Sequence, residues 1–504
     1  MKIRGWSYYV LLLLFPLLFL LHHINENFGI TDMEDVRFLA IIYLFTAAGI
    51  SVFSKLLMRS YRRAFVFAFV LLVINFFFGV YKDLAKSANF PAVISSYKYL
   101  LPLLFGLLIL LAVYLRRSNR TFARFSQAIA VFLLLNVVVE TGWVVYNILT
   151  TSDTHQDFGD RYQAANHPAG DSSKLRKPTV FWIVFDEYSR SSTLKRVWGF
   201  VNPLDSMLRS KGFFVADSAR SNYNFTHYSF SSTLGMVYLK NLQNHSRSEF
   251  RDRRREEVAL YDNNTVQIFE KNGYAINNFT IFRFRNHPSY GVHTFGFSTK
   301  QFINFQTFAG RIQSDIGWNF PTLFKPDKRR LDSMNVIKSL QDMDTAHKNL
   351  LASCLHAVRK GATDPTPAFY LFHFLLPHSP YMYNPDGSIA FKNGYHDSAQ
   401  HYIPQLQYTN TWVNLLADSI LSNYRGRDLV IIIQGDHAYR FAKEDPLFDF
   451  ESCNILYAVY CSDGDYSPWS RSHSAVNSFR ILFNKYFHTG LPLLPDSSFM
   501  LYEH

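Results

Sequence analysis

Five long apolar segments occupy most of the first 150 residues of this 504-residue chain. They run approximately over Trp6–Leu21, Phe38–Leu57, Ala64–Tyr81, Leu100–Leu115 and Ala128–Leu149. A helix needs about 20 apolar residues to cross a bilayer, and each segment has or approaches that length. The first segment ends without a small-residue cleavage site, so we interpret it as a retained anchor rather than a signal peptide. The sequence therefore predicts five N-terminal transmembrane helices, with buried helices of a soluble protein as the alternative.

Positive charge alternates between the loops that join these segments. It is concentrated before the first segment, between the second and third, and between the fourth and fifth, at Lys2, Arg4, Lys55, Arg59, Arg62, Arg63, Arg116, Arg117, Arg120 and Arg124. The intervening loops are acidic or mixed. The positive-inside rule then places the N-terminus in the cytoplasm, and an odd number of spans places everything after residue 150 on the other side. We expect a multi-pass protein of the cell (inner or cytoplasmic) membrane with an extracytoplasmic, periplasmic domain.

The formal net charge of +12 is compatible with nucleic acid or with an anionic lipid surface. No basic stripe with interleaved aromatic residues and no nucleic-acid-binding motif occurs in the sequence. The cytoplasmic Lys/Arg clusters instead fit a surface that faces anionic lipid. We therefore expect no nucleic-acid partner.

One acidic residue, Glu140, interrupts the fifth segment. An acid at such a position is a functional-site candidate by default. Near the end of a helix, however, it can also reach water or a neighbouring helix.

The remainder of the chain has the pattern of an α/β domain. Residues 151–177 are polar and form a predicted linker, and residues 178–504 form the predicted domain. Three apolar runs read as strands buried on both faces, Pro178–Phe185, Ala368–Leu376 and Asp428–Ile433. Helical stretches lie between them, over 331–359 and 409–424. This alternation predicts a mostly parallel central sheet covered by helices.

Polar residues follow each of the three predicted strands. The first run ends in Asp186-Glu187, the second in Pro377-His378 and the third in Asp436-His437. Because ligands of open α/β sheets bind beyond the carboxyl ends of the strands, we expect these side chains to meet. Oxygen ligands with one or two imidazoles suit a catalytic divalent cation.

These elements resemble the sulfatase-like branch of the alkaline phosphatase superfamily. Within it, the chain resembles membrane-anchored lipoteichoic-acid-synthase-like and phosphoethanolamine-transferase-like proteins, which place five helices before an extracytoplasmic domain. The segments that carry the resemblance are Val184–Glu187, Ser221–Thr226, Pro377-His378 and Gly435–His437. The resemblance implies an alkaline-phosphatase-like fold over 178–487 and a phosphotransferase activity.

The resemblance also implies roles for individual residues. The metal ligands would be Asp186, Glu187, Thr226, Asp436 and His437, with Glu187 either a ligand or a residue that shapes the pocket. Thr226 would be the catalytic nucleophile, and His378 and Arg440 would bind the substrate. The cofactor would be one divalent ion, Mn or Zn, with Mg as a further option. His473 is the candidate for a second metal ion, against the alternative of a surface-loop histidine.

The nucleophile role of Thr226 also has a physical basis. A threonine hydroxyl is a poor nucleophile at neutral pH unless a metal ion or a base activates it. A helix N-terminus would add backbone N–H groups for an anion. Thr226 could instead be an ordinary N-cap, and Ser229, Ser231 and Ser232 are local rivals. No Cys-x-Pro-x-Arg or Ser-x-Pro-x-Arg sequence surrounds Thr226, which argues against sulfate-ester hydrolysis of the formylglycine type.

Two function classes follow from these observations. In the first, the chain moves a phosphoryl-linked headgroup, such as phosphoethanolamine or phosphoglycerol, from a membrane phospholipid to an envelope glycan or lipid through a phospho-threonine intermediate. A phosphoester or sulfuric-ester hydrolase of the same superfamily is its close variant. In the second class, the chain is a non-catalytic lipid-binding or lipid-sensing protein of the cell envelope. Because the candidate ligands and nucleophile are all present, we favour the enzyme.

Overall fold

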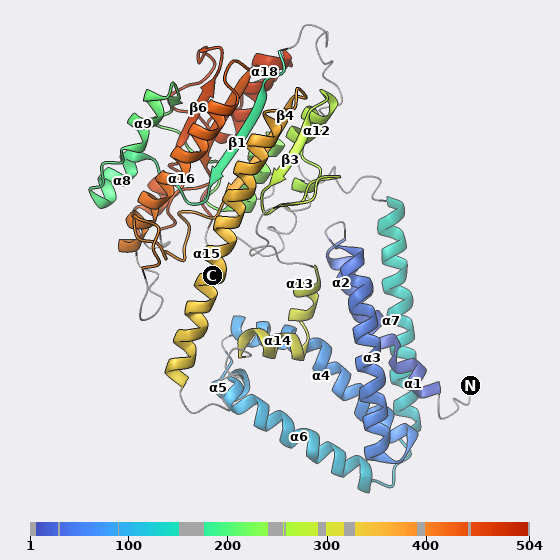
Figure 1. Cartoon of the computed structure of the whole chain (residues 1–504). Coiled ribbons are helices and arrows are strands. Elements are labelled where there is room, and N and C mark those ends of the chain that lie inside the picture. Colours follow the sequence, from blue (N-terminus) through green and yellow to red (C-terminus); the bar gives the residue numbers. More distant parts are fainter. Residues whose placement is uncertain are drawn as a thin grey trace. The chain divides into compact units, whose positions relative to one another are not determined.

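The computed structural model describes residues 7–28, 31–88, 90–150, 176–239, 256, 259–290, 299–316, 328–390, 399–441 and 445–501. The chain divides into two compact units (Figure 1). Unit 1 contains residues 1–154 and 297–328, and unit 2 contains residues 155–296 and 329–504. The sequence predicted a single domain over 178–504. In the structure, residues 297–328 of that range belong with the N-terminal helices in unit 1. Most of the predicted linker, 151–175, lies outside the described residues.

Unit 1 is helical. Its elements are α1 (Ser7–Leu12), α2 (Leu14–Glu26), α3 (Met33–Met58), α4 (Tyr61–Ser87), α5 (Ala92–Ser95), α6 (Tyr97–Arg117), α7 (Ala123–Thr150), α13 (Thr299–Phe305) and α14 (Phe308–Asp315). Among the described residues, four helices (α3, α4, α6 and α7) are long and apolar enough to cross a membrane. The first predicted span is divided at Leu13 into two shorter helices. The membrane-anchored character is thus supported by four helices, and the fifth span stays a prediction.

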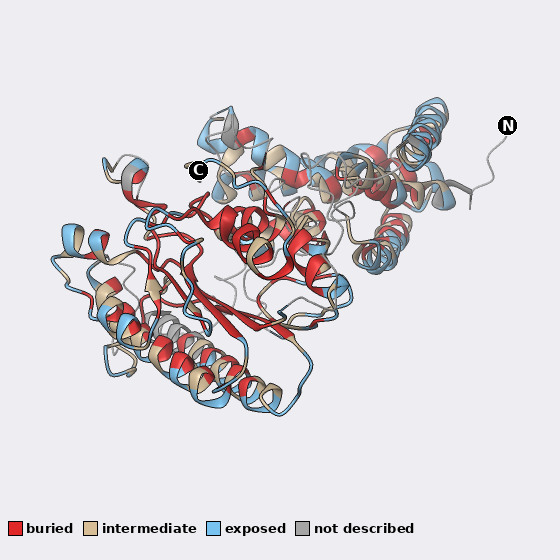
Figure 2. Cartoon of the chain, turned by 90° about the horizontal axis from the view of Figure 1, so that it is seen from above, coloured by how far each residue is buried: buried red, intermediate tan, exposed pale blue. Residues whose placement is uncertain are grey.

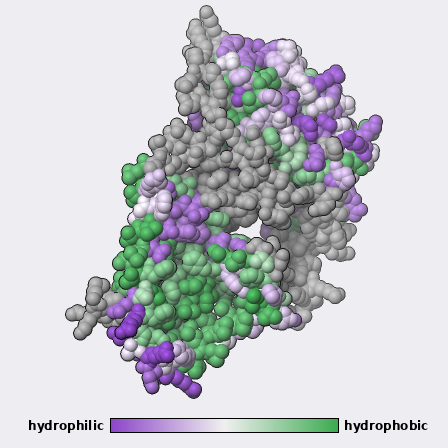
Figure 3. Space-filling view, turned by 180° about the vertical axis from the view of Figure 1, so that it is seen from behind, coloured by the Kyte–Doolittle hydropathy of each residue, from purple (hydrophilic) through white to green (hydrophobic). Residues whose placement is uncertain are grey.

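The long helices of unit 1 expose large apolar side chains. On α3, for example, Phe45 is 75% exposed and Leu56 is 75% exposed. Figure 3 shows such apolar side chains spread over the helices of this unit. Water-soluble monomers rarely expose a continuous apolar surface of this kind. Lipid contact accounts for it.

Helices α13 and α14 pack against the N-terminal helices although they are about 200 residues away in sequence. The backbone N–H of Asp32, which caps α3, donates to the Thr299 hydroxyl at 2.9 Å. Gly79 of α4 donates its N–H to the Gln306 carbonyl at 2.9 Å. A Cβ at position 79 would lie 2.5 Å from the Gln306 Cα, so only glycine allows this approach. These contacts make the 299–315 segment an integral part of unit 1.

Unit 2 is built on a six-stranded sheet with the strand order β2-β6-β5-β1-β4-β3. The strands are β1 (Thr179–Phe185), β2 (Phe214–Val215), β3 (Ala275–Phe279), β4 (Ala368–Phe374), β5 (Leu429–Gly435) and β6 (Tyr457–Cys461). Strands β5, β1, β4 and β3 are parallel, whereas β6 runs antiparallel to β5 and β2 antiparallel to β6. The sheet is therefore mixed, and the predicted mostly parallel arrangement is confirmed only in part.

Helices cover both faces of the sheet in unit 2. One face packs on α8 (Ser191–Trp198), α9 (Leu204–Ser210), α15 (Lys328–Gly361) and α16 (Tyr402–Asn423), and the other on α10 (Thr226–Gly235), α12 (Asn264–Lys271) and α18 (Ser478–Phe487). Figure 2 shows the buried sheet between these layers. Along β1, Phe181, Ile183 and Phe185 enter the first core, while Val180, Trp182 and Val184 enter the second. This alternation is the expected consequence of the two-residue repeat of a strand.

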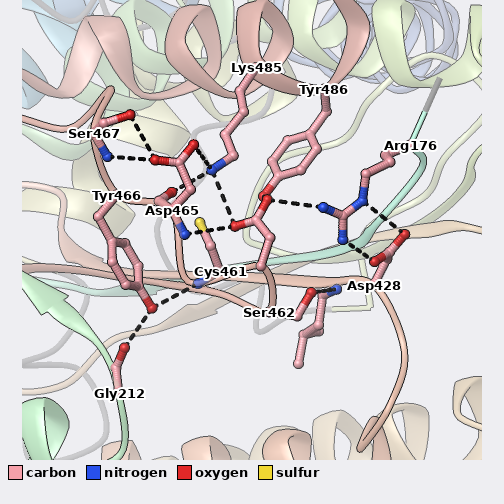
Figure 4. A network of polar contacts seen from close by, with 12 residues as sticks. Arg176, Gly212, Asp428, Cys461, Ser462, Asp465, Tyr466, Ser467, Lys485 and Tyr486 are labelled. Carbon is pink, nitrogen blue, oxygen red and sulfur yellow. Dashed lines mark hydrogen bonds and ion pairs between the residues drawn. The ribbon is translucent and has the colours of Figure 1, made fainter.

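A polar network joins the start of the described part of unit 2 to the far end of β6 (Figure 4). Arg176 pairs with Asp428 and, at 3.3 Å, with Asp463. Lys485 of α18 pairs with Asp463 at 3.2 Å and with Asp465 at 2.8 Å. Because this network lies before the first residue of β1 and β5, it is at the amino ends of the central strands. The polar residues that follow those strands are at the opposite edge.

Candidate metal centre

The two-residue repeat of the strands brings three polar side chains to one face of the sheet. Val184 of β1 lies in register with His373 of β4 and with Gln434 of β5. Asp186 lies two residues after Val184, and Asp436 lies two residues after Gln434. Both aspartates therefore lie on the face covered by α10, together with His373. Gly435 allows the two strand ends to meet, because a Cβ there would lie 2.6 Å from the Tyr188 carbonyl oxygen.

The side chains of Asp186, His373 and Asp436 form a compact cluster. Each offers one ligand atom, and these atoms all lie within 4.8 Å of one another. The three residues are between 1% and 4% exposed. His437 adds a second imidazole, with its Nε2 atom 3.3 Å from Asp186 Oδ1 and 3.8 Å from Asp436 Oδ2. Three of the predicted ligands, Asp186, Asp436 and His437, thus lie together with His373, which was not predicted.

Several polar atoms of this cluster have no hydrogen-bond partner. They are Asp186 Oδ1, Asp436 Oδ2, His437 Nε2 and both ring nitrogens of His373. Buried polar atoms in folded proteins are nearly always satisfied, so an orphaned group of this size needs an explanation. Carboxylate oxygens and imidazole nitrogens that point at one another are the donor set of a divalent-cation site. The residues present therefore fit a metal ion.

His437 is held in the orientation that a metal ligand requires. Its Nδ1 atom lies 2.8 Å from the Ala438 carbonyl oxygen, which accepts a hydrogen bond and leaves Nε2 to face the carboxylates. A backbone carbonyl in this position is a common outer partner of metal-bound histidines. Burial lowers the pKa of His437, but Asp436 and Asp186 outweigh that effect and raise it to about 9. A bound cation would compete with this proton, so metal affinity should fall at acid pH.

Asp186 is the common neighbour of all the imidazoles in the centre. Burial by itself raises the pKa of the Asp186 carboxyl, but His378, His373 and His437 more than offset this effect and hold it well below its ordinary value. The carboxyl is therefore ionised at neutral pH and can bind a cation without losing a proton first.

Glu187 lies beside the cluster and has its own partners. Its Oε1 atom accepts the backbone N–H of Arg440 at 3.0 Å, and its Oε2 atom accepts the Tyr381 hydroxyl at 3.1 Å. Its backbone has φ of 66°, a left-handed conformation that costs about 1–3 kcal/mol for a non-glycine residue. The backbone N–H also donates to Asp436 Oδ1 at 3.1 Å. Both carboxylate oxygens of Glu187 thus have protein partners, and Glu187 is not a member of the cluster found among the described residues. Its role as a ligand or as a residue that shapes the pocket stays a prediction.

Thr226 is the first residue of α10, and its hydroxyl oxygen lies 3.5 Å from Asp186 Oδ2. The N-cap of this helix is Phe225, which has no side-chain capping bond, so the reading of Thr226 as an N-cap is wrong. The rival serines have other partners. Ser229 donates to the Asp436 carbonyl at 2.5 Å, Ser231 bonds Glu256, and Ser232 donates to the Val237 carbonyl at 2.7 Å.

The two predicted substrate-binding residues meet at the edge of the centre. The guanidinium of Arg440 contacts His378 Nε2, and His378 Nδ1 lies 2.6 Å from the Ser379 carbonyl oxygen. The rings of His378 and His437 have their centroids 6.3 Å apart. Arg440 also lies over the Phe225 ring, 5.0 Å from its centroid, next to Thr226 in the sequence. A cation and an imidazole are thus placed together beside His437 of the centre.

Two histidines differ from the sequence analysis. The sequence analysis did not name His373 as a candidate ligand. The one sequence signal for it is that His373 is a polar residue within the otherwise apolar run Ala368–Leu376. His473 was read as a surface-loop histidine or a second metal ligand, and the structure contradicts the first reading because it is 3% exposed. His473 bonds the Ser478 hydroxyl at 3.0 Å, and burial lowers its pKa to about 3. It is not a member of the cluster found among the described residues.

Comparison with known proteins gives only distant matches. No protein-family model matches the sequence, and no curated protein matches it. Among solved structures, the C-terminal periplasmic domain of EcEptC from Escherichia coli in complex with Zn matches with a TM-score of 0.38 and 12% identity, over 67% of this chain and 89% of that one. The soluble domain of lipooligosaccharide phosphoethanolamine transferase A from Neisseria meningitidis has a TM-score of 0.36 and 13% identity, over 63% and 89%. A 2-O GAG sulfatase has a TM-score of 0.37 and 11% identity, over 63% and 72%.

Phosphoethanolamine transferases and sulfatases are the kinds of enzyme to which the sequence resemblance pointed. At these TM-scores, however, the functional assignment rests on the geometry of the centre.

Proposed function

We propose that this chain is a metal-dependent transferase that moves a phosphoryl-linked headgroup, of the phosphoethanolamine or phosphoglycerol type, from a membrane phospholipid to an envelope glycan or lipid. The observation that carries the proposal is the position of the Thr226 hydroxyl, 3.5 Å from the buried Asp186 carboxylate at the start of a helix. A threonine in this position has an activating group on one side and helix backbone N–H groups on the other.

The reaction would proceed in two displacements. In the first, Thr226 Oγ1 attacks the phosphorus of the donor, a new P–O bond to threonine forms, and the P–O bond to the diacylglycerol breaks. The threonine proton leaves with the diacylglycerol as its new hydroxyl hydrogen. In the second displacement, an acceptor hydroxyl attacks the same phosphorus, a P–O bond to the acceptor forms, and the P–O bond to Thr226 Oγ1 breaks. The acceptor's hydroxyl proton passes to Thr226 Oγ1 and restores the free threonine.

The residues around Thr226 have distinct roles in this scheme. Asp186, Asp436 and His437 would hold a divalent ion, Mn or Zn with Mg as a further option, and His373 would complete the set. When bound, such an ion stabilises negative charge on the phosphoryl oxygens and lowers the pKa of a nearby hydroxyl. His378 and Arg440 would contact the transferred group, and Glu187 fixes the backbone of Arg440.

A direct assay of headgroup transfer tests the proposal. The purified full chain is reconstituted in vesicles that contain phosphatidylethanolamine or phosphatidylglycerol, with Mn²⁺ or Zn²⁺, and the release of diacylglycerol is measured by mass spectrometry. We expect diacylglycerol to form in a metal-dependent manner and the headgroup to appear on an added glycan or lipid acceptor. Release of the free phosphorylated headgroup into water, with or without acceptor, would identify a hydrolase instead. No turnover by the metal-loaded chain would favour a lipid-binding protein.

The orientation of the chain gives a separate prediction. We propose an inner-membrane protein with a cytoplasmic N-terminus and an extracytoplasmic unit 2, because the Lys/Arg-rich loops all fall on one side. A phosphatase reporter that works only outside the cytoplasm should be active when fused after residue 160, and a reporter that works only inside should be inactive there. The matched control is a fusion in the loop at residues 118–121, where the activities should be reversed. A cytoplasmically active fusion after residue 160 would contradict the location proposed for unit 2.

A further inference from the structure

The loop before α10, residues 221–225, is held by a segment that is distant from it in the sequence. This segment, residues 495–501, follows α18, and we call it the strap. The backbone N–H of Phe499 in the strap donates to the Asn222 carbonyl at 2.8 Å. Tyr223 forms a parallel bridge with Phe499, and their rings are stacked with centroids 5.5 Å apart. The strap therefore lies alongside the loop and shares backbone bonds with it.

Asn224 makes a paired contact between the loop and the strap. Its Nδ2 atom donates to the Leu501 carbonyl at 2.8 Å, and its Oδ1 atom accepts the Leu501 backbone N–H at 2.8 Å. Asn224 is 1% exposed, so the loss of its amide would leave two buried backbone groups without a partner, which is costly. Because Asn224 lies two residues before Thr226, these bonds hold the backbone directly ahead of the proposed nucleophile.

The strap also packs against the first turn of α10. Leu501 is fully buried in a small apolar cluster with Phe225 and Tyr228, which precede and follow Thr226 in the sequence. This cluster is separate from the two cores that pack on the sheet. Further along α10, Phe230 enters the second of those cores. The later part of the helix is thus anchored on the sheet, whereas its first turn packs on the strap.

Among the described residues, the Thr226 hydroxyl is not fixed by a strong bond of its own. It lies 3.5 Å from Asp186 Oδ2, at the outer limit of a hydrogen bond, and the N-cap residue Phe225 makes no side-chain capping bond. The backbone of the loop therefore sets its position. A catalytic group has to be held within about 0.5 Å of its productive position, and a displacement of about 1 Å can lower a rate about a hundredfold.

We propose that Asn224 is a positioning residue, which holds Thr226 beside Asp186 through its two bonds to Leu501. The catalytic consequence of this hold rests on the proposed function, whereas the hold on the first turn of α10 does not. Two measurements therefore test the inference, one that requires transfer activity and one that does not.

Hydrogen exchange of the purified full chain, followed by mass spectrometry, measures the hold without any activity. Asn224→Ala should raise the exchange rate of the peptide over residues 226–230 at least about tenfold, because the first turn of α10 opens more often. The matched control is Asn477→Ala. Asn477 is 5% exposed and makes the same pair of bonds with the Leu494 backbone, at 2.8 and 2.9 Å. This control should lower Tm as much as Asn224→Ala does and leave exchange over 226–230 unchanged.

Diacylglycerol release from reconstituted vesicles measures the catalytic consequence. Asn224→Ala should lower kcat about ten- to a hundredfold, with KM for the lipid and metal content changed less than about twofold, because only the nucleophile is displaced. Asn477→Ala should keep the kcat of wild type. Asn224→Asp keeps the side-chain shape and the Oδ1 acceptor but turns an oxygen toward the Leu501 carbonyl, so it should lose kcat as the alanine variant does. It also provides the test if Asn224→Ala does not fold.

Three outcomes would overturn the inference. The first is an unchanged exchange rate over residues 226–230 in Asn224→Ala. The second is an equal fall of kcat in Asn477→Ala, and the third is full kcat in Asn224→Asp. If wild type shows no transfer at all, the proposed function fails, and the exchange rates alone decide whether Asn224 holds Thr226.

Discussion

Replacement of Thr226 by alanine should lower headgroup transfer by at least about a thousandfold, as the loss of a catalytic nucleophile does in other covalent enzymes. The side chain is half-buried and its hydroxyl contacts only Asp186 among the interactions the structure describes. Removal of one hydroxyl and one methyl group should therefore leave the fold and metal content nearly unchanged. Diacylglycerol release from reconstituted vesicles measures the effect.

The conservative variant and a distant threonine serve as controls for this prediction. Thr226→Ser keeps the oxygen and should retain measurable transfer, because only a methyl group is lost. Thr411→Ala changes an exposed threonine on α16 and should have full activity. Full activity of Thr226→Ala would rule out a covalent intermediate on Thr226. A Thr226→Ser variant as inactive as the alanine variant would mean that the methyl group, and not the nucleophile, is what the site requires.

The intermediate can be trapped directly. When the acceptor is absent, the headgroup should accumulate as a phosphodiester on Thr226 and add its mass to the intact protein. Peptide mapping then identifies the modified residue. Because Ser229, Ser231 and Ser232 are at most 4% exposed and hydrogen-bonded, we expect the adduct on Thr226 alone. An adduct on one of these serines would identify that serine as the nucleophile and would leave the two-displacement mechanism unchanged.

The central strands of unit 2 could be predicted from the sequence because they are continuous apolar runs. The run at 178–185 became β1 (Thr179–Phe185), and the run at 368–376 contains β4 (Ala368–Phe374). The edge strand β3 could not be predicted, since its sequence Ala-Ile-Asn-Asn-Phe has no apolar run and its position depends on pairing with β4.

The packing of segments that are far apart in the chain could not be predicted from the sequence either. The 299–315 segment has no span-length apolar pattern, and its place in unit 1 depends on contacts such as that of Gly79 with Gln306. Glu140 likewise acquires its partners only in the fold, where Oε1 lies 2.9 Å from His22 Nδ1 and Oε2 accepts Asn25 at 2.5 Å. These contacts match the reading in which the acid reaches a neighbouring helix.

The residues of the candidate centre could likewise be predicted only in part. Asp186, Asp436 and His437 follow predicted strands directly, so strand order alone brings them together. His373 lies within its strand, and its contribution depends on the register that places it beside Val184. Register between strands far apart in sequence is set by packing and cannot be read from one sequence. Glu187 and Asp186 are adjacent acids, and only the backbone turn decides which of them faces the imidazoles.

Asp436→Asn should lower metal affinity by at least about a hundredfold, because it removes one of the two buried carboxylates that face the site. Asparagine keeps an acceptor for the backbone N–H groups of Glu187 and His437, which donate to Asp436 Oδ1 at 3.1 and 2.8 Å. The variant should therefore fold. Metal content of the purified full chain is measured by elemental analysis after dialysis against a weak chelator, and near-ultraviolet circular dichroism checks the packing of unit 2.

His437→Ala should lose metal to a similar extent, and His373→Phe should decide whether His373 is a direct ligand. Phenylalanine fits the apolar side of that position, where the His373 ring lies 4.7 Å from the Phe230 ring. Asp465→Asn is the matched control, since this carboxylate is exposed and pairs with Lys485 at the other edge of the sheet. Its metal content should equal that of wild type.

The conclusion about the centre depends on which variants lose metal, and no single variant decides it. If Asp436→Asn and His437→Ala fold normally but keep full metal content, the orphaned atoms of the cluster do not bind the ion and the ligand assignment is wrong. If both lose metal while Asp465→Asn and His373→Phe retain it, His373 only supports the Asp186 carboxylate, from which its Nε2 atom lies 3.6 Å away. Loss in all three variants of the cluster would establish two carboxylates and two imidazoles around one ion. That donor set places a single cation beside Asp186, where the Thr226 hydroxyl already points.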